Sequence, residues 1–257
     1  MNALISQIEI YIMVLVRVAT IVMLMPFIGY RTIQLKVKIG FAAFLALIII
    51  PLLPSTQMPN PTNFLMLFFF IVKEVATGLI IGFASNIIFI SFVFAGTMVG
   101  LQMGFDMVQV LDPQSGGQVS LLGQYINIVA MLIFLAMNGH HFLIQAILHS
   151  FDLIPLTQVT IRHGLFDKIV AMSAEVFVLA IKIGIPAIAT LLLTNMALGI
   201  LARAVPQMNV FMVSFPLKIG IGMFTLMTFL PLFTYVFRKL MEIFQNDMMT
   251  IIKLLSA

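Results

Sequence analysis

The amino-acid sequence predicts an all-α membrane protein, polytopic and built from hydrophobic helical hairpins. Hydrophobic residues make up 62% of its 257 residues and charged residues only 9%, whereas a soluble domain has roughly 45–50% apolar and about 25% charged residues. The apolar residues are grouped in long runs, and a transmembrane helix needs about 20 such residues in succession. We therefore expect about six long helices, kinked and partly re-entrant, in a single domain over residues 1–257.

The first two apolar segments flank a short basic loop. The first, from about Ile8 to Ile28, has Arg17 at its middle, and a charge at that depth is expected to face protein rather than lipid. The basic loop 31–38 indicates the cytoplasmic side by the positive-inside rule. The second segment, Ile39 to Leu53, is short for a full span of about 20 residues.

The third apolar segment runs from Phe64 to Gly104 and is broken mainly by Lys73 and Glu74. One helix of that length would be about 60 Å long, twice a bilayer core. Two interpretations remain open: two segments bent near Ser85-Asn86, or one helix that extends past the membrane. Glycines spaced four apart indicate close helix packing, either a generic contact or a specific subunit interface. They are Gly78, Gly82, Gly96, Gly100 and Gly104.

A polar stretch at 106–118 separates the third segment from the fourth. Asp112 precedes a proline, which favours extended backbone, and Gly116-Gly117 permit positive φ. These residues by themselves predict a loop between two apolar helices, and a solvated turn is the simplest interpretation.

The next two segments are Val119 to Ala136 and Phe142 to Pro155. In the second, polar residues share one helical face opposite Leu and Ile, which predicts an amphipathic helix or the end of a long helix. His141 and His149 would lie roughly 12 Å apart along it, too far to share one ion, so no metal site is expected. The polar residues of this face are His141, Gln145, His149 and Asp152.

The segment Ile169 to Leu193 carries Glu175 and Lys182. Seven residues are nearly two helical turns, so these charges share a face about 10 Å apart. Each is expected to meet a charge on another helix or subunit, because an unpaired buried charge is costly. The charges expected to be buried or inter-subunit are Arg17, Lys73, Glu74, Glu175 and Lys182.

The most polar part of the apolar sequence is the stretch around Arg203. Asn195, Gly199, Arg203 and Gln207 recur at four-residue steps, which would form one polar and small-residue stripe on a helix. Such groups are costly in lipid unless they meet other protein or a water-filled cavity.

Three prolines are expected to kink or interrupt helices, since proline has no N–H and clashes with the preceding turn. They are Pro186, Pro206 and Pro216, the last just before Lys218. Helices broken near buried charges resemble the discontinuous helices of secondary transporters. A stand-alone transporter is therefore an alternative function, although the sequence contains no visible internal repeat.

The basic residues do not fit six plain spans. Those at 31–38, at Arg203 and at 238–253 all favour the cytoplasmic side. A re-entrant hairpin over Met208 to Phe237, bent at Pro216, would reconcile them, and such backbone is tolerated only against protein or a cavity. We expect several of these helices to be covered by partner subunits rather than by lipid.

The sequence R-A-V-P-Q-M-N-V-F at 203–211, followed by F-P-L-K-I-G at 215–220, resembles the signature of the FliR family, the R subunit of the bacterial flagellar type III export gate. The related subunit T of the injectisome export apparatus shares R-x-x-P-Q-x-N-x-F, but F-P-L-K is more typical of the flagellar family. The resemblance extends over nearly all of the chain.

This resemblance implies a non-enzymatic subunit of a helical gate assembly in the bacterial inner membrane, at the flagellar basal body. It implies FliP and FliQ as partners, FlhB around the entrance and FlhA nearby, with unfolded flagellar export substrates passing through the conduit. The motif residues are then expected to pack polar backbone and partner carboxylates at the gate entrance. They are Asn195, Arg203, Pro206, Gln207, Asn209, Pro216 and Lys218.

The resemblance also implies that the polar loop folds into the lumen and plugs the closed channel. A glycine-containing polar loop can be displaced without unpacking a core. The expected plug residues are Asp106, Met107, Leu111, Asp112, Pro113, Gln114, Ser115, Gly116, Gly117 and Gln118.

Other classes of protein find little support in the sequence. It contains no G-x-S-x-G, H-E-x-x-H or G-x-x-x-x-G-K-[ST] motif, so no enzyme is expected. Cysteine is absent and the carboxylates are scattered, so we expect neither a metal nor another cofactor. The net charge of +4 comes without a basic patch interleaved with aromatic residues, which argues against nucleic-acid binding.

Overall fold

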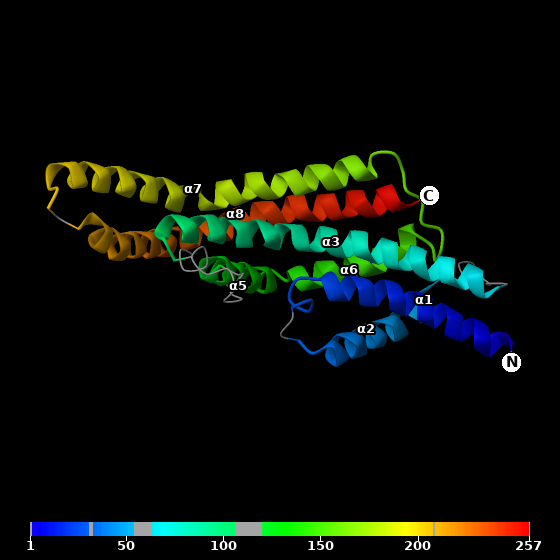
Figure 1. Cartoon of the computed structure of the whole chain (residues 1–257). Helices are drawn as coiled ribbons and strands as arrows, with labels where there is room; N and C mark the ends of the chain where they lie inside the picture. The colour runs from blue at the N-terminus through cyan, green and yellow to red at the C-terminus, as the bar shows by residue number, and fades with distance from the viewer. Residues whose placement is uncertain (1, 31–32, 54–62, 106–119, 208, 257) are drawn as a thin grey trace. The chain divides into compact units, whose positions relative to one another are not determined.

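The computed structural model describes residues 2–30, 33–53, 63–105, 120–207 and 209–256, and all regular elements among them are helices (Figure 1). The predicted all-α fold is therefore confirmed. In chain order the elements are α1 (Asn2–Leu24), α2 (Leu35–Ile49), the 3-10 helix η1 (Ile50–Leu52), α3 (Phe64–Met103), α5 (Leu121–Ala136), α6 (Gly139–Leu153), α7 (Leu165–Ala204) and α8 (Val210–Leu255).

Within the described residues, five helical stretches are long and apolar enough to cross a membrane, or six if α5 and α6 together form one span. This confirms the polytopic character expected from the composition. The single stretches are Gln7–Leu24, Leu35–Leu52, Phe64–Met103, Leu165–Ala204 and Met212–Leu255.

The chain divides into two compact units, and α3, α7 and α8 contribute to both. Unit 1 contains Met1–Ile87, Met137–Ser173 and Glu242–Ala257, and unit 2 contains Ile88–Ala136 and Ala174–Met241. The single export-gate domain expected over 1–257 stays a prediction.

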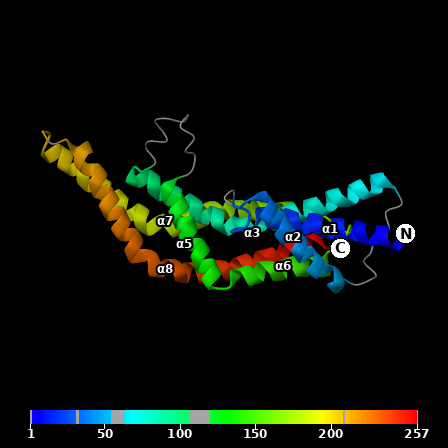
Figure 2. The same ribbon diagram turned by 90° about the horizontal axis from the view of Figure 1, so that it is seen from below.

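In unit 1, α1 packs against α2 at the N-terminal end of the chain (Figures 1 and 2). The glycines of α3 let α1 approach closely. A Cβ on Gly78 would lie 2.7 Å from Thr20 Cβ, and one on Gly82 would lie 2.7 Å from Leu24 Cβ. The side chains that α1 buries recur at helical spacing, as expected for a helix with one packed face. They are Ile10, Met13, Val14, Arg17, Val18, Ile21 and Val22.

In unit 2, α3 approaches α5 through a pair of glycines. A Cβ on Gly96 would lie 2.6 Å from the Cα of Gly123, so neither helix can carry a side chain at this crossing. At Gly78, Gly82 and Gly96 the four-residue spacing thus serves contacts within this chain.

An aromatic cluster fills the adjoining part of unit 2. Phe92 lies 5.3 Å from Phe237 and 6.0 Å from Phe233 between ring centroids, and Phe89 lies 5.2 Å from Phe134. The rings come from α3, α5 and α8, and each residue is at most 9% exposed. Tilted and edge-on aromatic pairs of this kind add to the area that they bury.

Two expectations about the long helices are resolved. The stretch that begins at Phe64 is one continuous helix of 40 residues rather than two segments. The predicted re-entrant hairpin bent at Pro216 is wrong, because α8 continues through both Pro216 and Pro231, just as α7 continues through Pro186. A proline removes one backbone hydrogen bond, whereas a full break in an apolar setting would leave several backbone groups unpaired.

Candidate functional site

A buried ion pair in unit 1 joins α1 to α3. Arg17 is 0% exposed and Glu74 is 1% exposed. The Nε–H of Arg17 donates to Glu74 Oε2 over 2.5 Å, and Nη2 donates to Oε1 over 3.1 Å. This bidentate geometry uses the planar fork of the guanidinium, which a lysine does not have.

The other side of the same guanidinium reaches the end of α6. Its Nη1 donates to the backbone oxygens of Ser150, at 3.1 Å, and Ile154, at 2.9 Å. Its Cζ also lies 4.4 Å from the ring centroid of Phe151. A cation is favourable at the C-terminus of a helix, where carbonyl groups lack partners within the helix. Arg17 therefore caps α6 while it neutralises Glu74.

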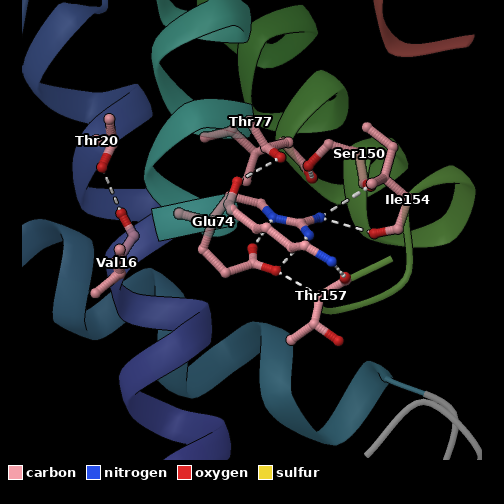
Figure 3. Close-up of polar contacts among 10 residues, drawn as sticks. Val16, Thr20, Glu74, Thr77, Ser150, Ile154 and Thr157 are labelled. Atoms are coloured by element: carbon pink, nitrogen blue, oxygen red, sulfur yellow. Dashed lines mark hydrogen bonds and ion pairs between the residues drawn. The ribbon is translucent and has the colours of Figure 1, made fainter. Parts of the chain in front are cut away.

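Glu74 in turn holds the turn that follows α6 (Figure 3). Its Oε1 accepts the backbone N–H of Thr157 over 2.8 Å. Lys73 Nζ donates to the backbone oxygen of the same threonine over 3.2 Å. Thr157 has a φ of +69°, an uncommon conformation for a residue that is not glycine. Two adjacent residues of α3 thus hold this strained position from both sides.

We call these residues the Arg17 cluster: Arg17, Glu74, Ser150, Phe151, Ile154 and Thr157. Its hydrogen bonds connect α1, α3, α6 and the turn after α6, so the chemistry that it supplies is structural. Breaking such a pair by removing one partner costs about 3–5 kcal/mol, because the remaining charge is buried without compensation.

The sequence marked Arg17, Lys73 and Glu74 as charges in apolar surroundings, but nothing in it indicated that two of them pair. Arg17 and Glu74 are separated by 57 positions, and no periodic pattern links residues that far apart. The sequence reasoning also missed Thr157, whose role depends on its backbone conformation. Lys73 is exposed along much of its side chain.

The two predicted charges of α7 lie in unit 2. Glu175 is partly buried and Lys182 is exposed, and no ion pair joins either of them to another described residue. They remain candidates for contact with a partner protein.

Four of the motif residues lie around the turn between α7 and α8. Arg203 is in the last turn of α7, and Pro206, Gln207 and Asn209 follow that helix. The expected stripe therefore ends at Arg203, because Gln207 is no longer helical. All four side chains are exposed.

Asn209 begins α8 as its N-cap. Its Oδ1 accepts the N–H of Met212 over 3.3 Å, which satisfies one of the free donors of the first turn. Pro216 is exposed in α8, whereas Lys218 in α8 and Asn195 in α7 are partly buried.

The expected plug lies outside the described residues. This applies to Asp106, Met107, Leu111, Asp112, Pro113, Gln114, Ser115, Gly116, Gly117 and Gln118.

A second polar junction, also missed from the sequence, holds the end of α8 in unit 1. Lys168 Nζ lies 2.6 Å from Asp247 Oδ1. The backbone N–H groups of Thr160 and Arg162 donate to Leu255 and Leu254 over 3.1 and 3.2 Å. These bonds satisfy carbonyl groups at the C-terminus of α8.

No group of three or more metal-binding side chains occurs among the residues that the structure describes. The polar face predicted for α6 is present, since His141, Gln145, His149 and Asp152 are exposed. On the opposite face Leu143, Ala146 and Ile147 are buried.

Comparison with known proteins gives a match along most of the chain. Residues 8–244 match the family described as "Bacterial export proteins, family 1". The flagellar biosynthetic protein FliR of Bacillus subtilis (strain 168) is 33% identical over 100% of this chain and 100% of its own length. The proteins of the same name from Escherichia coli (strain K12) and Caulobacter vibrioides are each 29% identical. They cover 88% and 95% of this chain and 86% and 100% of their own lengths.

Proposed function

Since this chain belongs to the FliR family of bacterial export proteins, we propose that it is a non-enzymatic subunit of the flagellar type III export gate. It resides in the bacterial inner membrane, at the flagellar basal body. The observation that carries this proposal is the similarity to a flagellar biosynthetic protein over the whole of both chains.

The dimensions of the helices support a gate subunit enclosed by other proteins. Helices α3 and α7 have 40 residues and α8 has 46, which corresponds to about 60–69 Å at the α-helical rise. The hydrocarbon core of a bilayer is about 30 Å thick. Each of these helices therefore extends well beyond the lipid.

The surfaces of these helices support the same conclusion. In the five stretches that are apolar enough to cross a membrane, only 17–39% of the residues are buried against other parts of this chain. Large apolar side chains remain exposed even near the α7–α8 turn, where Ile200 is 72% exposed and Met212 is 73% exposed. This exposed apolar surface extends farther along the helices than the bilayer is thick. It is therefore better explained by contact with partner subunits than by contact with lipid.

The partners that we propose are FliP and FliQ within the gate, with FlhB around the entrance and FlhA nearby. The exposed α7–α8 turn supplies groups suited to such contacts. The guanidinium of Arg203 can pair with partner carboxylates, and the amide of Gln207 can bond to partner backbone. Glu175 and Lys182 are available for ion pairs with a neighbouring subunit.

In the assembled gate this chain would form part of a conduit for unfolded flagellar export substrates. The loop Asp106–Gln118 would close that conduit in the resting state. The Arg17 cluster would serve this function indirectly, because it keeps α1, α3 and α6 in a fixed arrangement while the loop moves.

The proposal is tested by co-expression of the full chain with FliP and FliQ, followed by purification in mild detergent. We expect a stable hetero-oligomer that contains all three chains. A stable monomer that never co-purifies with FliP would count against the proposal. Vesicles that contain this chain alone are the control, and solute uptake by them would support the stand-alone transporter instead.

A further inference from the structure

An open groove in unit 1 lies between the end of α2 and the end of α6. Its volume is about 410 Å³, within the range of about 300–1,000 Å³ for sites that hold small molecules. Apolar side chains form most of its lining, and polar side chains stand on the α6 side. The lining residues are Ile49, Leu52, Leu53, Gln145, Leu148, His149, Phe151 and Asp152.

The position of this groove relates it to the edge of a membrane. The stretch Leu35–Leu52 is apolar enough to cross a bilayer, and the groove lies at its C-terminal end. Leu52 is 64% exposed there. At the end of a membrane span the surroundings change from acyl chains to headgroups, so an occupant of the groove meets both.

The polar side of the groove carries an imidazole and a carboxylate close together. His149 Nδ1 lies 3.4 Å from Asp152 Oδ2, and the two side chains are 54% and 66% exposed. Asp152 is in the last turn of α6, which contains no basic residue. A carboxylate at this end of a helix is disfavoured by the helix dipole, so a cation beside it is favourable.

We propose that this groove binds a phospholipid with a primary ammonium headgroup. One acyl chain lies on Leu52, Leu53 and Leu148, and the ammonium group donates to the carboxylate of Asp152. The lipid phosphate accepts hydrogen bonds from the Gln145 amide and from a ring N–H of His149. Along α6, the side chains that bind the phosphate, Gln145 and His149, come before Asp152, which binds the ammonium. This is the same order in which phosphate and ammonium follow each other in the headgroup.

The proposed lipid also contacts the Arg17 cluster. Phe151 lines the groove, and its ring lies over the guanidinium of Arg17. Phe151 therefore separates the groove from the ion pair, whose side chains are already buried at 0% and 1% exposure.

The experiment is native mass spectrometry of the full chain in mild detergent, titrated with three lipids of identical acyl chains. These are phosphatidylethanolamine, phosphatidylcholine and phosphatidylglycerol. Phosphatidylcholine is the informative comparison, because its methylated ammonium has no N–H to donate. We expect one tightly bound phosphatidylethanolamine per chain, with an affinity about tenfold above that of phosphatidylcholine.

Two variants and a control identify the groove as the site. Asp152→Asn should abolish the preference for phosphatidylethanolamine, whereas Asp167→Asn, an exposed carboxylate of the same unit outside the groove, should retain it. Leu52→Trp should weaken the binding of all three lipids. The preference is the ratio of two affinities measured on the same folded protein. A variant that unfolds would lose both affinities, which is distinct from a change in their ratio.

Equal affinity for phosphatidylethanolamine and phosphatidylcholine would overturn the proposal. So would a preference that persists in Asp152→Asn, or tight binding that persists in Leu52→Trp. These outcomes are independent of the co-purification with FliP, so the two proposals fail separately.

Discussion

The backbone N–H of Thr157 donates a hydrogen bond to the carboxylate of Glu74, 83 positions earlier in the chain, over 2.8 Å. The same carboxylate binds the guanidinium of Arg17. One side chain of α3 therefore fixes both a helix that precedes it and a turn that lies far after it in the sequence.

Replacement of Glu74 by Gln leaves Arg17 buried beside a neutral group. We expect a loss of about 3–5 kcal/mol in unfolding free energy, measured as a lower midpoint of thermal unfolding in detergent. Glu242→Gln is the matched control, because it makes the same change at an exposed glutamate of unit 1 and should change the midpoint little.

The double variant Arg17→Met/Glu74→Leu removes both charges together. Replacing a complete buried ion pair by apolar residues is often close to neutral, so the double variant should be more stable than Glu74→Gln. A strictly additive loss from the two single replacements would contradict the direct coupling of these side chains.

Gly96 is expected to tolerate no larger residue, because a Cβ there would lie 2.6 Å from the Cα of Gly123. Gly96→Ala should force α3 and α5 apart and destabilise unit 2 by about 1–3 kcal/mol. The control is Gly199→Ala on α7, where nothing lies within 4 Å of the added atom. That change should be neutral or stabilising, since alanine is the better helix former, and thermal unfolding measures both.

Arg203→Glu should weaken assembly of the proposed gate without unfolding the chain. The side chain is exposed at the end of α7, and reversal of its charge would repel a partner carboxylate. The yield of FliP that co-purifies with the chain measures the effect. Arg162→Glu, another exposed arginine, is the control, and an equal loss in both variants would argue against a specific contact at Arg203.

Deletion of Gly116-Gly117 should make the closed gate conduct small ions, because the shortened loop would no longer fill the lumen. Ion conductance of reconstituted gates is the measurement. The length-preserving variant Gly116→Ala/Gly117→Ala separates loop length from glycine content. Unchanged conductance after the deletion would remove the plug assignment.

Several properties of this protein followed from the sequence because they are local or cumulative. Apolar runs of helical length predicted an all-α polytopic protein, and Pro206 correctly marked the end of α7. The motif at 203–220 was enough to recognise the family. The amphipathic face of α6 could be read from spacing alone, since side chains four residues apart share a face of any helix.

The tertiary structure decided the remainder, because those outcomes depend on what lies opposite each residue. Pro216 does not break α8, since the loss of one hydrogen bond is smaller than the cost of unpairing a full turn in apolar surroundings. Gly78, Gly82 and Gly96 of α3 pack against α1 and α5 of the same chain, although their spacing suited a partner subunit equally well. Arg17 and Glu74 lie 57 positions apart in the sequence, so only the folded arrangement of the helices brings their charges together. Neither charge could be buried without the other.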